Sequence, residues 1–224
     1  MAWPGSPDEL IAIQLELASA QPAAWRPAGA PLLGACFVCF SRGKRGAGTA
    51  GDPGWAGAAL ADGRTAVVAG AAGAPYEPGL LALREGPLME TAVHALPQSP
   101  EVLIVNATGR DHPRRAGLAV HLGAVLELPS LGVTHRTLAA QGEWPPDERG
   151  ARSPFLVDGE VVGCWLRTRA GTRPLAVHAG WRVDLETAVE LVLSHSRRRT
   201  PEPLRLARRA ARSARARAEL PSNR

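Results

Sequence analysis

Aromatic residues, cysteines and long apolar runs are all scarce in this chain of 224 residues. Aromatic side chains make up 4%, so alanine, valine and leucine must supply most of the core. Three unevenly spaced cysteines exclude a disulfide scaffold, and no apolar run approaches the ~20 residues that a membrane span needs. The opening residues MAWPGSPDEL lack the basic and apolar regions of a secretory signal. We therefore expect a soluble, cytoplasmic protein that is monomeric and has no membrane partner.

Lysine is nearly absent, because Lys44 is the only one among 26 basic residues. The arginines gather at the end of the chain, where residues 197–224 contain ten arginines and two glutamates, a net charge of +8. Since the whole chain carries +5, residues 1–196 carry −3. The basic segment is interpreted either as a solvated helix or frayed end, or as an arm that contacts phosphates and gains affinity by releasing counterions.

Hydrophobic periodicity and turn residues predict an alternation of strands and helices. Two hairpins are expected to turn at Asp62-Gly63 and at Asp158-Gly159. A proline-rich linker is expected over 21–31 and a glycine-rich loop over 41–54. The predicted helices cover 7–21, 80–96, 112–126, 184–195 and a stretch after 203, and the predicted strands cover 32–40, a hairpin at 55–70, 101–105, 128–135, a hairpin at 155–168, and 174–179.

The strand–helix–strand unit of residues 101–135 implies a parallel pair of strands joined by a crossover helix. With hairpins before and after it, the order of elements predicts an α/β fold, a mixed β-sheet flanked by helices. Residues 200–203, Thr-Pro-Glu-Pro, interrupt the pattern. We therefore expect one domain over 1–203 and an Arg/Ala-rich basic tail over 204–224.

Polar residues that follow the strand at 101–105 are candidates for a functional site. The sequence Asn-Ala-Thr-Gly begins at Asn106, at the carboxyl edge of the sheet, where α/β proteins usually bind ligands. His112, Arg114 and Arg115 open the next predicted helix, and a helix N-terminus with two arginines suits a phosphate. The alternative is a crossover helix with a basic, solvated face.

Cys36 and Cys39 form a C-x-x-C pair, a spacing that also occurs in redox and zinc sites. Positions i and i+3 of a strand point to opposite faces, so the two sulfurs cannot easily bind one ion. We interpret both residues as core thiols.

The string HPRRAGLAVHLG, preceded by a strand and followed by LPSLGVTH, resembles the signature of the endonuclease V (deoxyinosine 3′-endonuclease) family. IQLELAS, LLGA, PYEPGLLALREGP and GWRVDLETAV match the same family in the same order, so the resemblance covers about residues 10–203. It implies a ribonuclease H-like mixed sheet flanked by helices. It also implies DNA repair by hydrolysis of a phosphodiester on the 3′ side of deaminated adenine (inosine), with Mg²⁺ or Mn²⁺ as cofactor and DNA, or RNA, as partner.

The resemblance places the family's metal ligands at positions that this chain has mostly changed. Glu85 is retained, whereas the family's two aspartates fall at Cys36 and Asn106 and a late histidine falls at Trp181. Cysteine is a soft ligand and asparagine lacks the charge, so a degraded metal site is implied. Cys36 and Trp181 are not expected to bind a metal, and Trp181 is expected to plug the former pocket. Glu85 and Asn106 stay catalytic candidates, with His135 at the position of a family lysine.

Two further residues are candidates to replace the lost ligands. Asp111 follows Asn106 in the same loop, and His178 precedes Trp181 by three residues. Their alternative interpretations are a solvated loop acid and a histidine at a strand end.

The residues implied to recognise nucleic acid are better preserved. Tyr76 lies in a loop that two prolines stiffen, and the resemblance implies that it is a wedge between strands beside the lesion. The alternative is a surface tyrosine. Gly109 and its loop resemble the pocket that reads the extruded base through backbone groups. The implied nucleic-acid-binding residues are Tyr76, Pro75, Pro78, Gly109, His112, Arg114 and Arg115.

Three functions are compatible with these residues. The first is an inosine-directed endonuclease of weakened activity, and the second is an inactive module that binds inosine-containing DNA or RNA. The third is a scaffold whose arginine-rich tail binds nucleic acid without specificity.

Overall fold

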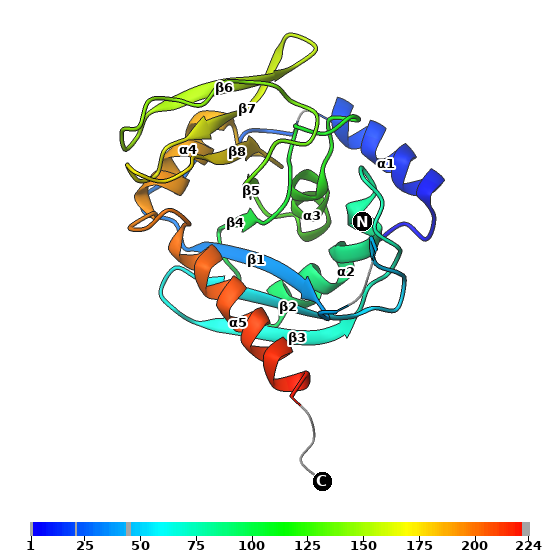
Figure 1. Cartoon of the computed structure of the whole chain (residues 1–224). Coiled ribbons are helices and arrows are strands. Elements are labelled where there is room, and N and C mark those ends of the chain that lie inside the picture. The colour runs from blue at the N-terminus through cyan, green and yellow to red at the C-terminus, as the bar shows by residue number, and fades with distance from the viewer. Residues whose placement is uncertain (1, 21, 44–45, 221–224) are drawn as a thin grey trace.

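The computed structural model describes residues 2–20, 22–43 and 46–220 of the chain. Its centre is an eight-stranded sheet of order β3-β2-β1-β4-β5-β8-β7-β6, with helices on both faces (Figure 1). The strands are β1 (Leu33–Phe40), β2 (Pro53–Leu60), β3 (Thr65–Ala71), β4 (Val102–Val105), β5 (Ser130–Thr134), β6 (Arg152–Val157), β7 (Glu160–Leu166) and β8 (Leu175–Ala179). The helices are α1 (Pro7–Ser19), α2 (Leu81–His94), α3 (Leu118–Leu126), α4 (Leu185–Ser194) and α5 (Glu202–Ala218).

The sheet is mixed because three central strands are parallel and the outer strands are antiparallel. β4 pairs in parallel with β1 on one side and with β5 on the other, and α3 is the crossover between β4 and β5. The hairpins β2–β3 and β6–β7 are antiparallel, and each turns at its Asp-Gly pair, as predicted. Asp158 and Gly159 both have positive φ, +51° and +81°, as a tight two-residue hairpin turn requires. The predicted mixed sheet with flanking helices is confirmed.

Alternation along the buried strands divides the core into two layers. Leu103 and Val105 of β4 pack with α2 and α3, whereas Val102 and Ile104 pack with α4 on the other face. Figure 1 shows α1, α2 and α3 on one side of the sheet and α4 and α5 on the other. Cys36 lies in the first layer, and Cys39 packs with α5 on the opposite face. The two sulfurs therefore face apart, as predicted.

The predicted helix over 112–126 is wrong in its first half, because α3 begins only at Leu118 with Gly117 as its N-cap. Arg115 adopts a positive φ of +57°, which breaks a helix at that point. A Cβ on Gly117 would lie 2.4 Å from the carbonyl oxygen of Thr108, so only glycine fits there. Arg114 and Arg115 therefore lie in a loop and not at a helix N-terminus.

The segment after residue 203 is a helix packed on the sheet, which corrects the interpretation of a solvated helix or frayed end. Leu204, Leu206, Ala207 and Ala211 of α5 are buried, and α5 crosses β1, β2 and β3 (Figure 1). Gly57 of β2 lets the helix approach closely, since a Cβ there would lie 2.4 Å from the carbonyl oxygen of Ala207. Within the described residues, the segment after residue 203 therefore packs against the same sheet as the residues before it.

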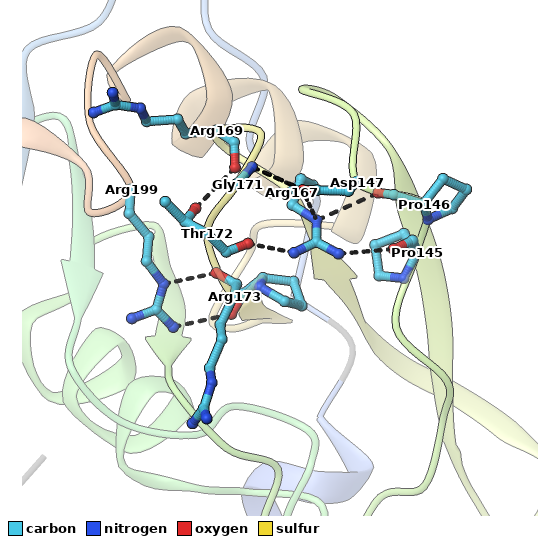
Figure 2. A network of polar contacts seen from close by, with 10 residues as sticks. Pro145, Pro146, Asp147, Arg167, Arg169, Gly171, Thr172, Arg173 and Arg199 are labelled. Carbon is cyan, nitrogen blue, oxygen red and sulfur yellow. Dashed lines mark hydrogen bonds and ion pairs between the residues drawn. The ribbon is translucent and has the colours of Figure 1, made fainter.

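Hydrogen bonds hold the linker between α4 and α5 in place. Arg199 donates to the carbonyl oxygens of Arg173 and Pro174, at 2.7 and 3.1 Å, in the loop before β8 (Figure 2). In the same network Arg167 is buried and donates to the carbonyl oxygens of Pro145, Pro146 and Thr172. Because these contacts fix the start of α5, they also fix the arginines that α5 carries.

Three parts of the sequence predictions lie outside the described residues. They are Gln21 at the predicted end of the first helix, residues 44–45 of the glycine-rich loop, and residues 221–224 of the basic tail. Across the part of the chain that is described, no helix is both long and apolar enough to cross a membrane.

Candidate nucleic-acid interface and catalytic centre

A pocket of about 290 Å³ opens at the carboxyl edge of the central strands, and we call it the edge pocket. Its volume is at the lower end of the range for small-molecule sites, ~300 to 1,000 Å³. Polar groups of Asn106, Thr108 and Thr134 border an apolar floor that includes Ala107 and Leu118. The other residues that line it are Gln14, Tyr76, Glu77, Pro78, Gly79, Leu81, Ala82, His112, Arg136, Thr137 and Leu138.

Tyr76 stands at the mouth of the edge pocket, on the loop that leads from β3 to α2. Its side chain is 46% exposed, and Pro75 and Pro78 beside it are also exposed. The aromatic tip is therefore free to contact a ligand. The structure places these three residues where the sequence predicted a projecting loop.

The base of this loop is held by one carbonyl oxygen that accepts three hydrogen bonds. The oxygen of Gly79 accepts from Gln14 Nε2 at 3.1 Å and from Arg114 Nη2 at 2.8 Å, and His112 Nε2 lies 3.1 Å away. Arg114 Nε also donates to Gln14 Oε1 at 2.5 Å. Arg114 is thus used inside the protein, and the prediction that it holds phosphate is not supported by its position. Local sequence gave no signal of this contact, because Gly79 and Arg114 lie 35 residues apart.

His112 is buried and its hydrogen bonds define one neutral tautomer. The backbone N–H of Arg114 donates to Nδ1 at 3.1 Å, so the proton lies on Nε2 and points to the Gly79 carbonyl oxygen. Burial lowers the pKa of His112 to about 4, so the neutral form persists at neutral pH. His112 therefore holds the loop in position as a neutral imidazole and does not form an ion pair with a phosphate.

A buried ion pair supports the same loop from below. Arg84 Nη2 lies 3.0 Å from Asp52 Oδ2, and both side chains are almost fully buried. Arg84 Nη1 donates to the carbonyl oxygens of Ala74 and Thr49, at 2.8 and 3.0 Å. Its guanidinium also lies over the ring of Phe40, 4.1 Å from the ring centroid. The glycine-rich loop and the Tyr76 loop are therefore tied to the same side chain of α2.

Arg115 and Gly109 also have structural contacts in place of the predicted ligand contacts. Arg115 Nη2 donates to the carbonyl oxygen of Val157 at 3.0 Å and pairs with Asp158 at 3.1 Å in the β6–β7 turn. Gly109 packs against β8, where a Cβ would lie 2.0 Å from the carbonyl oxygen of Ala179. Neither residue lines the edge pocket.

Asp111 is not available as a replacement ligand. It is fully buried, and its carboxylate accepts hydrogen bonds from the backbone N–H groups of residues 138, 139 and 140 at 2.6 to 2.8 Å. His178 is also fully buried, with Nε2 2.9 Å from Thr134 Oγ1. Burial lowers the pKa of His178 to about 4, although the charge of Asp111 opposes the shift. Asp111 therefore fixes the wall of the edge pocket at residues 137–138, and His178 contacts Thr134 beside it.

Trp181 lies away from Asn106, so its expected role as a plug is corrected. Its backbone N–H donates to Ser130 Oγ at 3.1 Å, at the amino end of β5, whereas Asn106 follows the carboxyl end of β4. The indole packs with Leu17 and other apolar residues of α1 and α3. Trp181 therefore belongs to the core beneath α3.

Glu85 and Cys36 lie near one another on α2 and β1. The Cys36 thiol is fully buried and lies 3.8 Å from the sulfur of Met89, one helical turn after Glu85. Burial and the charge of Glu85 raise the pKa of Cys36 above its ordinary range. Burial raises the pKa of Glu85 to about 8, and Arg84 opposes that shift.

Asn106 is bound by an arginine that the sequence analysis did not single out. Arg208 of α5 donates to Asn106 Oδ1 from Nε at 2.8 Å and from Nη2 at 2.6 Å. Its Nη1 lies 3.3 Å from His135 Nε2. Partial burial and the charges of Arg208, Arg199 and Arg212 lower the pKa of His135 to about 4. Two of the three predicted catalytic residues, Asn106 and His135, thus contact the same guanidinium.

Arg208 also borders a second depression, of about 480 Å³, along α5, which we call the arginine groove. Its lining residues are Thr200, Arg205, Arg208, Arg209, Arg212, Ser213 and Ala216. Arg205 pairs with Glu202, while Arg212 stacks over Phe37 at 5.3 Å. Arg208 lines this groove and contacts Asn106 of the edge pocket, so its side chain lies between the two depressions.

Comparison with known proteins identifies the family. The family model described as Endonuclease V matches residues 57–209, more than half of the chain. The chain belongs to the endonuclease V family. Curated members include an endonuclease V of Roseiflexus sp., 47% identical over 134 residues, which are 59% of this chain and 60% of that protein. The endonuclease V of Nocardia farcinica is 44% identical over 151 residues, 67% of this chain and 66% of the relative. The first of these matches spans about three fifths of the relative's length.

Solved endonuclease V structures share the whole fold. The structure from Streptomyces avermitilis has a TM-score of 0.86 and 33% identity, and covers 98% of this chain and 97% of its own. The catalytic domain of human endonuclease V has a TM-score of 0.80 and 26% identity, and covers 95% and 98%. The endonuclease V of Ciona intestinalis, solved with DNA that contains inosine, has a TM-score of 0.77 at 19% identity and covers 95% and 98%. The ribonuclease H-like fold implied by the motifs is confirmed.

The cleavage chemistry of the endonuclease V family uses a divalent metal, and the donors present here do not fit one. Mg²⁺ takes oxygen ligands, above all carboxylates. The Cys36 thiol is buried against Met89, and the Asn106 oxygen already accepts two hydrogen bonds from a cation. Glu85 is the one family carboxylate in place, and burial favours its protonated form. Among the described residues, no group of three or more histidines, cysteines, aspartates and glutamates is placed to hold a metal.

Proposed function

We propose that this protein recognises inosine in nucleic acid and holds the strand without cutting it. The observation that carries the proposal is the position of Tyr76. Its side chain is exposed at the mouth of the edge pocket, and its loop is held by three contacts to the carbonyl oxygen of Gly79. This is the second of the three functions that the sequence leaves open. Membership of the endonuclease V family and the inosine-containing DNA bound by the Ciona relative support the choice of ligand.

The edge pocket has the features that an extruded base requires. Proteins that bind a flipped base pair its polar edge with hydrogen-bonding groups and stack its ring on apolar or aromatic side chains. Asn106, Thr108 and Thr134 offer polar groups, and Leu118 and Ala107 offer an apolar floor. Tyr76 would fill the space that the base leaves, and a preset loop reduces the entropy cost of that insertion.

The strand backbone would lie in the arginine groove. Arg209 and Arg212 are exposed and line the groove beside Arg208. Guanidinium groups bind phosphates by charge and by paired hydrogen bonds. The arginines of α5 therefore act in binding as part of the folded domain, in place of the flexible arm considered from the sequence.

Hydrolysis on the 3′ side of inosine is the second candidate function, which the retained Glu85 favours. One experiment separates the two. Pure protein is titrated with inosine and adenine oligonucleotides, as DNA and as RNA, and the same samples are run on a nicking gel with Mg²⁺ or Mn²⁺. We expect preferential binding of inosine and no nicks. Nicking that Glu85→Ala abolishes would establish the nuclease instead.

The wedge role is tested with a matched pair of variants. Stacking of a base on an aromatic side chain contributes about 1–3 kcal/mol, so Tyr76→Ala should weaken inosine binding about 5- to 150-fold. Trp144→Ala removes another exposed aromatic, which lies outside the edge pocket, and should leave the affinity unchanged. Equal affinity for inosine and adenine oligonucleotides in the unaltered protein would refute recognition and leave only non-specific binding.

A further inference from the structure

The side chain of Arg208 has a position that a surface arginine seldom has, because all three of its nitrogen atoms are engaged. Two of them donate to the single oxygen Asn106 Oδ1, at 2.8 and 2.6 Å, and the third faces His135. The guanidinium plane is therefore fixed in direction as well as in place. Asn106 follows the central strand β4 and lines the edge pocket, so this cation lies at the functional edge of the sheet.

The backbone that carries Arg208 is equally fixed. The preceding residue, Ala207, is fully buried and lies where α5 approaches Gly57 of β2 most closely. Upstream, Arg149 donates to the carbonyl oxygens of Ser196 and Leu193, both at 2.9 Å, which ties the linker before α5 to the loop before β6. The backbone of Arg208 is therefore held by packing, and its two hydrogen bonds to Asn106 hold the side chain.

No carboxylate partner compensates the charge of Arg208 within the described residues. Its guanidinium contacts Asn106, His135 and the ring of Phe37, whose centroid is 5.8 Å away, and none of these is an acid. Arg209 and Arg212 add positive charge along the same groove. An anion is the ligand that such a site attracts, and a phosphodiester is the anion that the proposed function brings to it.

From these contacts we propose that the guanidinium of Arg208 takes the place of a divalent cation beside Asn106 and binds a backbone phosphate there, so that nucleic acid is held without metal. The inference rests on the proposed function for the identity of the ligand. A Mg²⁺ ion binds oxygen at ~2.1 Å, and at Asn106 Oδ1 it would meet the fixed cation of Arg208. Arg208 thus supplies the positive charge and at the same time excludes the metal.

The first test measures binding of inosine oligonucleotides with EDTA and with Mg²⁺. We expect equal affinities in the two buffers, and we expect Arg208→Gln to lower both about tenfold or more, since a charged hydrogen bond is lost. Arg217→Gln, on the exposed part of the same helix, removes the same charge outside the arginine groove and should have little effect. An affinity that Mg²⁺ raises tenfold, or that Arg208→Gln leaves unchanged, would overturn the inference.

The second test asks whether Arg208 excludes a metal. Cys36→Asp with Asn106→Asp restores two carboxylates near Glu85, and Mn²⁺ binding is measured by electron paramagnetic resonance with and without Arg208→Ala. We expect Mn²⁺ to bind at least tenfold more tightly when Arg208 is also replaced. Equal binding in the two variants would show that Arg208 does not exclude the ion. Thermal melts verify folding, and if the carboxylate variants do not fold, the first test decides alone.

The two proposals fail in different ways. If inosine and adenine oligonucleotides bind equally but Arg208→Gln weakens both in EDTA, recognition of inosine is refuted and the role of Arg208 stands. If inosine is preferred but Arg208→Gln has no effect, recognition stands and the role of Arg208 is refuted.

Discussion

The arginine groove predicts how binding of nucleic acid depends on salt. Arg209 and Arg212 are exposed, line the groove and, within the described part of the chain, form no ion pair with an acidic residue. Replacing both with glutamine keeps the length of each side chain and removes two positive charges. Arg169→Gln with Arg217→Gln removes two exposed charges elsewhere, so both double variants change the net charge equally.

The size of the effect follows from counterion release. Each phosphate contact contributes a slope of about −0.9 to the plot of log K against log salt on duplex DNA, so losing two contacts changes the slope by about 1.8. The ratio of the binding constant of the unaltered protein to that of the variant therefore falls about twelvefold when salt rises fourfold, from about 50 to 200 mM. A variant that loses only overall charge should show almost no change in slope.

Fluorescence anisotropy at four salt concentrations, with one labelled duplex that contains inosine, measures these slopes. The control variant must retain the slope of the unaltered protein while Arg209→Gln with Arg212→Gln loses about two contacts. If the two double variants give the same slope, the strand backbone does not lie in the arginine groove, and the assignment of that surface is wrong.

Three further predictions concern the framework of the site. His121 is fully buried, and burial lowers its pKa to about 4 from an ordinary 6.5, so the unfolded chain binds more protons between these values. The free energy of unfolding should therefore fall by about 2 kcal/mol from pH 7.5 to pH 5 because of this residue. His121→Phe keeps a ring stacked on Trp3, and urea unfolding of this variant should show a fall that is smaller by about 2 kcal/mol. Arg84→Met removes the buried cation beside Asp52 together with its hydrogen bonds to the carbonyl oxygens of Ala74 and Thr49, and urea unfolding should show a loss of about 3–5 kcal/mol, whereas a loss below about 1 kcal/mol would refute a stabilising role of Arg84. Gly57→Val forces α5 away from β2 and should weaken oligonucleotide binding, while Gly29→Ala, where a Cβ meets nothing within 4 Å, should not.

Local patterns predicted the fold well because its strands and turns obey local rules. The continuous apolar run of β4 and the two Asp-Gly turns are formed by neighbouring residues, and the structure has each at the predicted place. The start of α3 failed because residues far away decide it. Arg115 leaves the helical region to reach the carbonyl oxygen of Val157, 42 residues later, and no local pattern contains that partner.

The same reason explains the errors in the site. The exposure of Tyr76 is predictable because its flanking prolines are adjacent in sequence. The sequence indicates Arg208 only as part of a basic run, because its partner Asn106 lies 102 residues earlier and on another element. The sequence leaves Asp111 either a solvated acid or a ligand for the same reason, since the three N–H groups that donate to it come from a loop nearly 30 residues away. Residue types favour a class of ligand, while long-range contacts decide which residues are free to bind one.

Under the proposed function, the contacts of the Gly79 carbonyl oxygen affect the speed at which the protein would search for inosine. Its three partners come from α1 and from the loop before α3, so the Tyr76 loop cannot swing open without breaking several contacts together. A protein that scans along a strand must sample each base briefly, and a probe that needs no rearrangement adds no delay at each step. Sampling would then be limited by the opening of the nucleic acid itself, and bases that unpair most readily would be tested first.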